Sequence, residues 1–424
     1  MKALFALLAL IPAAETHAAD AGLPPALQEL FDTERAFVRL AAEKGFRDSF
    51  YTYFADDGIA FNPHPFRVRT SLANQPPSPG PMGAVWAPVY GDIAEAGDLG
   101  WDTGPLIFEG KNGAANRHGM FFSIWKRQAD GSFKVVLDIG SDTPAPVVPM
   151  NEPVHVSTRP AAATRHGHVD AALATAGLLA VERAFLATAA AESLGRAYGS
   201  RLDDSARVHR PGRMPVVGRV ALNEWANTQG AKFRGEPLAA DVSRSGDLGY
   251  AYGNYERLGD GSEAGYYARV WKKDAKGDWR IVMDTVSPLQ AGSKPLTADL
   301  LRAEEPYLAG RWAEAEAAYQ QYVDANPGNA FAWNRLGTSQ VQQKKYAQAV
   351  QSLDRAIEIG GGVAVDYYNL ACAYALSGNV EKALDNVERA IDAGFRQRAQ
   401  YESDPDLASL RELPRFKALM QPLQ

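Results

Sequence analysis

Glu34-Arg35-Ala36-Phe37 returns 148 residues later as Glu182-Arg183-Ala184-Phe185, and the sequence around it returns in the same order. Further matched segments are Gly97-Asp98-Leu99-Gly100-Trp101 with Gly246-Asp247-Leu248-Gly249-Tyr250, and Ile124-Trp125-Lys126-Arg127 with Val270-Trp271-Lys272-Lys273. Many matches at a nearly constant offset predict that one domain has been duplicated in tandem.

Each copy begins with apolar residues at helical spacing, such as Phe37, Leu40 and Ala41, and continues with β-rich segments. Asp130-Gly131 and Lys276-Gly277 mark a final hairpin in each copy. A helix followed by a run of antiparallel strands predicts an α+β domain with a curved sheet wrapped on the helix. We expect these domains at residues 26–143 and 173–288.

A proline-rich linker is predicted between the copies, over residues 144–172. It carries His155, His166 and His168, but no Asp, Glu or Cys lies at a spacing that would complete a metal site. These histidines are interpreted as solvated loop residues, and no metal site is predicted.

After Leu296 the pattern becomes wholly helical and repeats every 34 residues. Trp333, Leu336, Gly337, Ala349 and Ala356 fall opposite Tyr367, Leu370, Ala371, Ala383 and Ala390. This pattern resembles the tetratricopeptide repeat, with three units over 296–397 and capping helices over 398–424. The resemblance implies a protein or peptide partner on the first helix of each pair, with candidate contacts Asn334, Arg335, Thr338, Gln342, Tyr368 and Asn369.

Residues 1–19 have the pattern of a cleaved signal peptide, with one positive charge, a short apolar run and small residues at the end. We therefore expect a periplasmic or secreted protein, and no later stretch is read as a membrane span. A net charge of -6 gives no basic footprint for nucleic acid. The single cysteine, Cys372, excludes a disulfide within the chain and is interpreted as a core residue.

The duplicated domain resembles the SnoaL-like, nuclear-transport-factor-like cone fold of ketosteroid isomerase, above all its uncharacterised secreted branch. The residues that carry the resemblance are Phe54-Ala55-Asp56-Asp57-Gly58-Ile59-Ala60-Phe61-Asn62-Pro63 and the segment from Trp125 through Asp130-Gly131 to Asp138. The isomerase's general-base aspartate would fall on Asn62 and Arg210. Its two other catalytic donors would fall on or near Val38, Leu186, Ser123 and Arg269. Steroid isomerisation is therefore not expected.

The same resemblance places definite residues inside each cone, because strand side chains alternate. Copy one would present Asn62, Phe121, Ser123, Trp125 and Asp138, and copy two Arg210, Tyr267, Arg269, Trp271 and Asp284. Asp138 is the candidate general base. The alternative is that Asp138 and Asp284 satisfy an indole, a backbone group or an arginine. If the copy-two arginines are free, an anion is expected to bind there.

Two functions follow from these patterns. The first is an exported binding or scaffold protein, with two small-molecule pockets and a protein-interaction repeat array. The second is an enzyme of isomerase, dehydratase or hydrolase type that acts on a small apolar substrate through Asp138. No cofactor is expected, since the sequence has no phosphate-loop or dinucleotide fingerprint. An open cavity with Asp138 unpaired would favour the enzyme, and a filled cone the scaffold.

Overall fold

A computed structural model describes residues 22–423 except 74, 79, 111–114, 152–154, 157–168, 260–262 and 292. The predicted signal peptide and two linker histidines, His166 and His168, lie outside these described residues. The chain divides into two compact units. The N-terminal unit comprises Met1–Gly58 and Pro77–Lys294, and the C-terminal unit Ile59–Pro76 and Pro295–Gln424. Sheets with packed helices precede a helical region, so the class is α+β with a C-terminal helical array.

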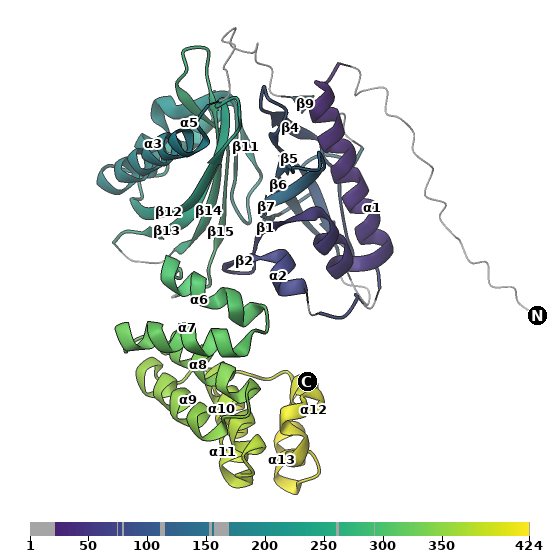
Figure 1. The fold of residues 1–424 in the computed structure, drawn as a ribbon, viewed down its shortest axis with the longest axis vertical. Coiled ribbons are helices and arrows are strands. Elements are labelled where there is room, and N and C mark those ends of the chain that lie inside the picture. Colours follow the sequence, from purple (N-terminus) through teal and green to yellow (C-terminus); the bar gives the residue numbers. More distant parts are fainter. Residues whose placement is uncertain are drawn as a thin grey trace, which may run out of the picture. The chain divides into compact units, whose positions relative to one another are not determined.

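The first copy begins with the long helix α1 (Pro25–Tyr53). Its strands are β1 (Phe54–Phe61), β2 (Pro65–Arg67), β3 (Ala84–Trp86), β4 (Tyr90–Ile93), β5 (Leu99–Phe108), β6 (Arg117–Arg127), β7 (Phe133–Asp138), β8 (Ser141–Thr143) and β9 (His155–Val156), and a short helix, α2 (Val68–Leu72), follows β2. The sheet has the order β2-β1-β7-β6-β5-β4-β9, with β3 on β5 and β8 on β6. Helix α1 lies along one face (Figure 1) because Leu30, Phe31 and Phe37 share its buried side.

The second copy repeats the plan with helices α3 (Ala171–Ala191), α4 (Leu194–Tyr198) and α5 (Arg219–Asn227) and a 3-10 turn, η2 (Gly199–Arg201). Its strands are β10 (Leu202–His209), β11 (Val216–Val217), β12 (Phe233–Val242), β13 (Leu248–Arg257), β14 (Ala264–Lys273) and β15 (Trp279–Pro288). They form a six-stranded sheet in the order β11-β10-β15-β14-β13-β12, with β10 and β15 parallel. Asp170 caps α3 by accepting the Leu173 N–H at 2.9 Å.

Two expectations from the sequence need correction. Residues His155 and Val156 of the linker form β9, which pairs in parallel with β4 and so covers an edge that would otherwise expose unpaired backbone groups. Among the described residues, α3 has the length and apolar composition of a membrane span, although none was expected. This helix also carries Glu182 and Arg183 and buries Phe185 and Leu186 in the core of the second domain.

The two sheets contact each other through the faces that carry no helix. The central strands are consequently buried on both sides. On β6, Trp125 lies on the helix side, whereas Phe122 and Ile124 lie on the opposite side, and all three are 1% exposed or less. This two-sided burial explains why β5, β6 and β14 are buried along most of their length rather than at alternate residues.

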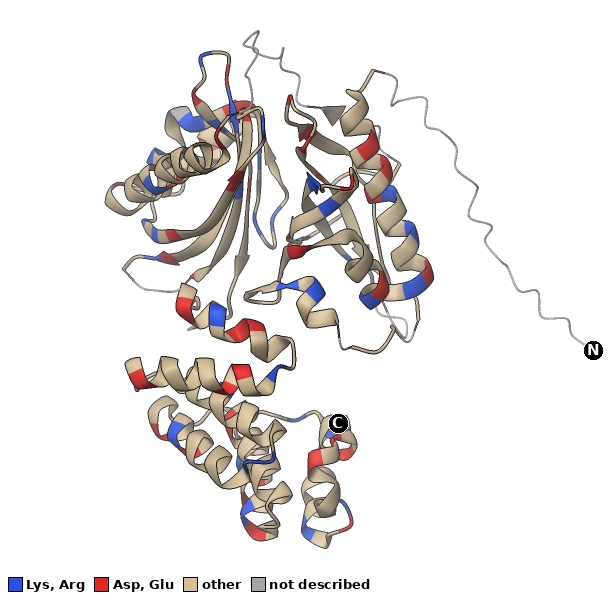
Figure 2. Cartoon of the chain, in the orientation of Figure 1, with Lys and Arg blue, Asp and Glu red and all other residues tan. Residues whose placement is uncertain are grey.

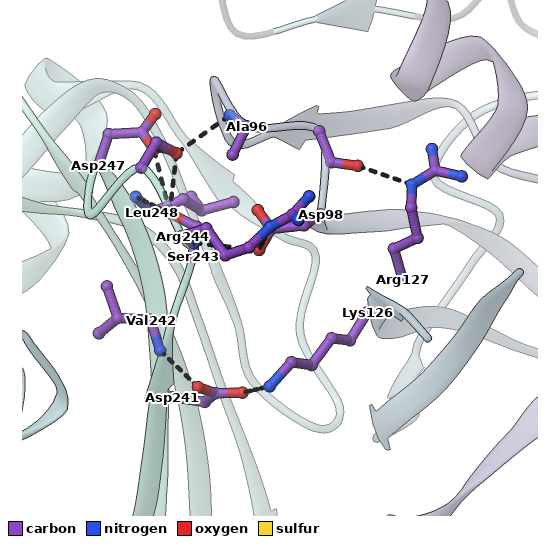
Figure 3. A network of polar contacts seen from close by, with 12 residues as sticks. Ala96, Asp98, Lys126, Arg127, Asp241, Val242, Ser243, Arg244, Asp247 and Leu248 are labelled. Carbon is purple, nitrogen blue, oxygen red and sulfur yellow. Dashed lines mark hydrogen bonds and ion pairs between the residues drawn. The ribbon is translucent and has the colours of Figure 1, made fainter. Parts of the chain in front are cut away.

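Equivalent residues of the two copies form reciprocal ion pairs across this contact. Lys272 Nζ lies 2.6 Å from Asp92 Oδ2, and the matching Lys126 pairs with Asp241 (Figure 3). The repeated Gly-Asp-Leu-Gly turns take part as well. Asp98 Oδ2 accepts the backbone N–H of Arg244 at 3.0 Å, and Asp247 Oδ2 accepts that of Glu95 at 3.2 Å. The copies therefore pair about an approximate twofold relation within one chain.

The C-terminal unit contains α6 (Ala298–Leu308), α7 (Trp312–Ala325), α8 (Ala330–Gln342), α9 (Tyr346–Gly360), α10 (Ala364–Leu376), α11 (Val380–Asp392), α12 (Arg398–Ser403), the 3-10 turn η3 (Pro405–Leu410) and α13 (Pro414–Met420). Figure 2 shows Lys and Arg interspersed with Asp and Glu along these helices. Helices α8 and α9 approach closely at Gly337, where an added Cβ would lie 2.6 Å from Leu353 Cγ. Residues 59–76 belong to this unit, with Arg67 Nη1 3.3 Å from Glu305 Oε1.

The reciprocal pairs should differ in energetic weight. The Lys272 and Asp92 side chains are 15% and 9% exposed, whereas Lys126 and Asp241 are 41% and 26% exposed. Lys272→Met leaves the buried Asp92 carboxylate without its cation and should lower the free energy of unfolding by about 3 kcal/mol. Lys126→Met, the matched control, should cost about 1 kcal/mol or less. Urea denaturation of both variants measures the difference, and equal losses would contradict this ranking.

Candidate functional site

In each copy a buried glutamate on the first helix accepts a hydrogen bond from a sheet tryptophan. Trp125 Nε1 donates to Glu34 Oε2 at 3.1 Å, and Trp271 Nε1 donates to Glu182 Oε2 at 2.7 Å. Both glutamates are fully buried. Sequence reasoning used this motif to detect the repeat but did not select the glutamates as site residues. The available signal was a carboxyl repeated in both copies three residues before a phenylalanine.

Three buried or half-buried carboxyl groups meet in the first domain. Glu34 Oε1 accepts the Trp86 indole N–H at 2.5 Å, and Asp102 Oδ1 accepts the Trp125 indole N–H at 3.1 Å. Asp138 Oδ2 accepts the Ser123 hydroxyl at 2.8 Å. Within the described part of the chain, no Lys or Arg forms an ion pair with these carboxyls. Among all the residues that the structure describes, no group of His, Cys, Asp or Glu side chains is placed to hold a metal ion.

Burial without a cation raises the pKa of every carboxyl in this cluster. The pKa of Glu34 rises to about 8, although its indole donors oppose the shift. The pKa of Asp102 is raised by burial and by the neighbouring Glu34. That of Asp138 rises to about 6, with the Ser123 hydrogen bond acting in the opposite direction. Near neutral pH the cluster therefore keeps a proton on Glu34.

The second domain balances the same positions with arginine. Arg269 Nε lies 2.5 Å from Asp284 Oδ2, and a further nitrogen of Arg269 pairs with Glu182. Arg210 Nη2 lies 2.8 Å from Asp284 Oδ1 and donates to Tyr198 Oη at 2.7 Å. Burial alone would raise the pKa of Asp284, but the two guanidinium groups outweigh it and lower that pKa. The carboxylates of Asp284 and Glu182 thus neutralise the two arginines. The sequence alone had left open whether these arginines were free to bind an anion.

A cavity of about 390 Å³ lies in the second domain, next to this charged network. Its wall combines apolar and aromatic side chains with several arginines and two tyrosines. The lining residues are Phe185, Leu186, Ala189, Leu194, Arg210, Pro211, Arg213, Trp225, Gln229, Phe233, Tyr255, Arg257, Glu263, Tyr267, Arg269, Val286 and Pro288. Three of the five residues predicted for the copy-two pocket therefore line it: Arg210, Tyr267 and Arg269. Trp271 and Asp284 are buried and contact Glu182 and Arg269 respectively.

The copy-one prediction fits less well. Phe121, Ser123 and Trp125 are buried on one face of β6, and Ser123 contacts Asp138. Asn62 is exposed, because β1 ends at Phe61 and the chain turns there into β2, with the Asn62 N–H donating to the His64 carbonyl. Its expected place inside the first domain is therefore wrong.

The interior between α1 and the first sheet is occupied by aromatic side chains. The Phe37 ring centroid lies 5.2 Å from that of Trp86 and 6.4 Å from that of Trp125. Asp138 retains some exposure, but it is paired with Ser123. In the first domain Asp138 is therefore paired, and aromatic rings occupy the space between α1 and the sheet.

Two of the predicted partner contacts join neighbouring repeats. Asn334 Nδ2 donates to Asp366 Oδ1 at 2.7 Å, and Asn369 Nδ2 donates to Asn334 Oδ1 at 3.1 Å. Asn334 is only 7% exposed. This chain of hydrogen bonds links α8 to α10, so Asn334 has a structural role in the array.

The other predicted contacts differ in availability. Arg335 Nε pairs with Glu304 Oε1 at 2.7 Å and lies over the Tyr307 ring. Tyr368 is buried, and its hydroxyl donates to Asp404 in the segment that leads into η3. Thr338 is half-buried and donates to the Asn334 carbonyl, whereas Gln342 is exposed. The most accessible of these side chains thus follow Asn334 at four-residue spacing on one face of α8.

Comparison with known proteins identifies the helical region. Tetratricopeptide-repeat families match residues 307–370 and 367–393. The peroxisomal targeting signal receptor of Pichia angusta is 30% identical over 97 residues, which cover 22% of this chain and 17% of that protein. Stress-induced-phosphoprotein 1 of Caenorhabditis elegans is 25% identical over 101 residues, which cover 24% of this chain and 31% of that protein. This chain thus spans less than a third of the length of these two relatives.

Solved structures show a likeness over part of this chain. The crystal structure of MamA is 21% identical, with a TM-score of 0.25, and the match covers 29% of this chain and 68% of that one. The first tetratricopeptide repeat of Spaghetti (RPAP3), bound to the HSP90 peptide SRMEEVD, is 20% identical with a TM-score of 0.22, and the match covers 23% of this chain and 76% of that one. Together with the family matches, the helix pairs establish a tetratricopeptide-repeat array at the C-terminus.

The carboxyl cluster predicts how stability depends on pH. Glu34 keeps its proton when folded until about pH 8 but loses it near its ordinary pKa of 4.5 when unfolded. Its contribution is therefore complete below that lower pKa and is lost as pH rises through about 8. Urea denaturation should show the free energy of unfolding falling between those limits, and Glu34→Gln should reduce this slope.

Glu182→Gln is the matched control for that measurement. It removes a carboxylate that pairs with Arg269, so it should lower stability across the whole interval. A wild-type profile that is flat in this interval, or a Glu34→Gln profile as steep as that of the wild type, would contradict the assigned protonation of Glu34.

Proposed function

We propose that this protein is an exported scaffold in which the tetratricopeptide repeats bind a protein partner and the paired sheet domains form a body with a ligand cavity. The repeat matches over residues 307–393 carry the proposal, because helix pairs of this kind present one helix of each pair to a partner. The relatives with related repeats include two named as a receptor and a phosphoprotein.

The sheet domains are proposed to have the cone fold of the SnoaL-like family. The order of elements in both copies supports this, since each begins with a helix packed on a sheet whose main strands pair antiparallel. Within that proposal the copies have different tasks. The first domain, filled by Phe37, Trp86 and Trp125, acts mainly as a structural partner, and the second domain provides the cavity.

Export is proposed from residues 1–19. We expect the mature protein in the periplasmic or secreted fraction, with an N-terminus at or next to Asp20. N-terminal sequencing of protein purified from fractionated cells measures this directly. A full-length protein that begins at Met1 and is recovered from the cytosolic fraction would contradict export.

The partner surface is proposed to be the face of α8 that includes Thr338 and Gln342, and its continuation on α10 at Val365, which is 45% exposed. Photo-crosslinking tests this face. A benzoylphenylalanine residue in place of Gln342 should form a covalent adduct with one protein of defined mass. The same probe in place of Glu358, which is exposed on α9, should not form that adduct.

Both probe variants must show the thermal unfolding midpoint of the wild type, so that the comparison reports on surface alone. The same adduct at both positions, or an adduct at Glu358 only, would contradict the proposed face. Asn334 is avoided as a probe position because its loss would disturb the link between α8 and α10.

A further inference from the structure

We infer that the start of the repeat array is a recognition site for an extended basic segment of a partner protein, and that residues 62–67 of this chain (the internal segment) occupy the site as a competitor. Because this site specifies the partner of the repeats, its role rests on the proposed scaffold function. The contacts that carry it lie within the C-terminal unit, to which residues 59–76 belong.

The internal segment lies against the first helices of the array. Helix α6 contacts both β2 and α2. Arg67 Nη1 lies 3.3 Å from Glu305 Oε1 on α6, and the His64 ring centroid lies 6.2 Å from that of Phe331 on α8, edge to face. Because α6 and α8 are the first helices of consecutive pairs, the internal segment covers part of the side on which the sequence predicts partner contacts.

The covered residues share one face of α8 with the proposed partner surface. Phe331, Arg335, Thr338 and Gln342 follow one another at three- and four-residue spacing, which places them on the same side of the helix. Phe331 at one end contacts His64, whereas Gln342 at the other end is exposed. A partner chain that follows this face from Gln342 towards α6 therefore reaches the internal segment and has to displace it.

Charge complementarity specifies a basic partner. Residues 59–72 contain two arginines, Arg67 and Arg69, and no Asp or Glu. Residues 295–424 contain 17 Asp and Glu against 13 Lys and Arg, so an acidic helical region holds a basic segment. The side chains of Arg67 and Glu305 are 49% and 32% exposed. An ion pair this exposed is weak, so it can be exchanged for a similar contact with another chain.

The site offers a carboxylate beside an aromatic ring. Arg335 is held by the array itself, since its Nε lies 2.7 Å from Glu304 Oε1 and its guanidinium lies 4.8 Å from the Phe331 ring centroid. Glu305 is the carboxylate that meets the internal segment, although Arg311 of the array also lies 3.9 Å from it. A ligand for this site therefore needs a guanidinium group for Glu305 and a ring for Phe331.

His64 contributes a ring rather than a charge. Burial and the nearby Arg335 lower its pKa to about 4, so the imidazole is neutral near pH 7. Pro63 and Pro65 flank it and restrict the backbone on both sides. The partner is therefore expected to present an extended, proline-containing segment with a neutral ring followed by an arginine, in the order found in residues 63–67.

The second copy contains a matched basic segment that does not belong to the helical unit. Residues 208–217, between β10 and the end of β11, lie in the N-terminal unit. They contain two arginines, one histidine and two prolines, the same numbers as residues 60–69, but in a different order. Val217 lies on β11 where Arg67 lies on β2. The two segments therefore separate an effect of residue order from an effect of charge alone.

Fluorescence anisotropy with the full chain and two fluorescein-labelled peptides, of residues 60–69 and of residues 208–217, tests the site. A double variant, His64→Ala with Arg67→Glu, should release the internal segment, because it removes the ring that faces α8 and places a carboxylate against Glu305. The released variant should bind the first peptide about tenfold more tightly than the wild type does, since the tethered competitor is lost. It should also prefer the first peptide to the second by about tenfold.

A further substitution locates the binding. Glu305→Gln, added to the released variant, should weaken binding of the first peptide by about threefold, the size expected for an exposed ion pair. Glu358→Gln, an exposed change on α9, is the control and should leave the affinity unchanged. All variants must show the circular dichroism spectrum of the wild type. Arg67→Glu alone, at an exposed position, provides the same comparison if the double variant loses stability.

Three results would overturn the inference. Equal affinity of the released variant for both peptides would mean that charge alone is recognised. Equal binding of the first peptide by the released and wild-type chains, or binding by neither, would mean that the internal segment does not occupy a recognition site. None of these results changes the outcome of crosslinking at Gln342, so a failure here is distinguishable from a failure of the partner surface on α8.

Discussion

The hydrogen bond from a sheet tryptophan to a buried helix glutamate sets how each helix lies on its sheet. Trp125 donates to Glu34 and Trp271 donates to Glu182 at equivalent places. A carboxyl group removed from water must be neutralised by a proton or by a cation, because an isolated buried charge is very costly. The first copy keeps a proton, and the second supplies Arg269. The two interiors therefore differ in how this carboxyl group is neutralised.

The pairing of the copies leaves those interiors free to diverge. Each helix-free sheet face is covered by the other copy, and the lysine and aspartate pairs cross the contact in both directions. Stability of the pair therefore places few demands on the inner faces. One inner face is filled with aromatic rings around Phe37, and the other encloses a cavity beside Arg210 and Arg269. A duplicated domain can in this way hold one copy with a filled interior and one copy with a cavity.

The repeats and the interior positions on β6 and β14 could be predicted from the sequence, because spacing and strand alternation are local properties. In the structure Ser123 contacts Asp138, and Arg269 contacts Asp284. Asn62 was misplaced because the end of β1 depends on how the chain turns there, which no local pattern specifies.

Long-range pairing explains the other omissions. From the sequence alone, Glu34 resembles a surface residue of an amphipathic helix. Its burial becomes evident only in the fold, where the sheet places Trp86 and Trp125 against it. The pairing of Lys272 with Asp92 depends on the register between two sheets, which sequence spacing does not encode. The sequence favoured pairing of Arg210 with an aspartate but left a free arginine open, because only the structure gives the distance from Arg210 to Asp284.

The most direct measurement is the titration of the two equivalent glutamates by NMR of side-chain-carboxyl ¹³C-labelled protein, with Glu34→Gln and Glu182→Gln used to assign the signals. The account predicts that the Glu34 carboxyl is protonated at neutral pH and titrates with a midpoint near pH 8, and that Arg269 opposes the rise in the Glu182 pKa that burial causes, so the two carboxyls titrate separately. Two carboxyls that are both ionised at neutral pH, or that titrate together, would contradict the claim that one copy neutralises this group with a proton and the other with arginine.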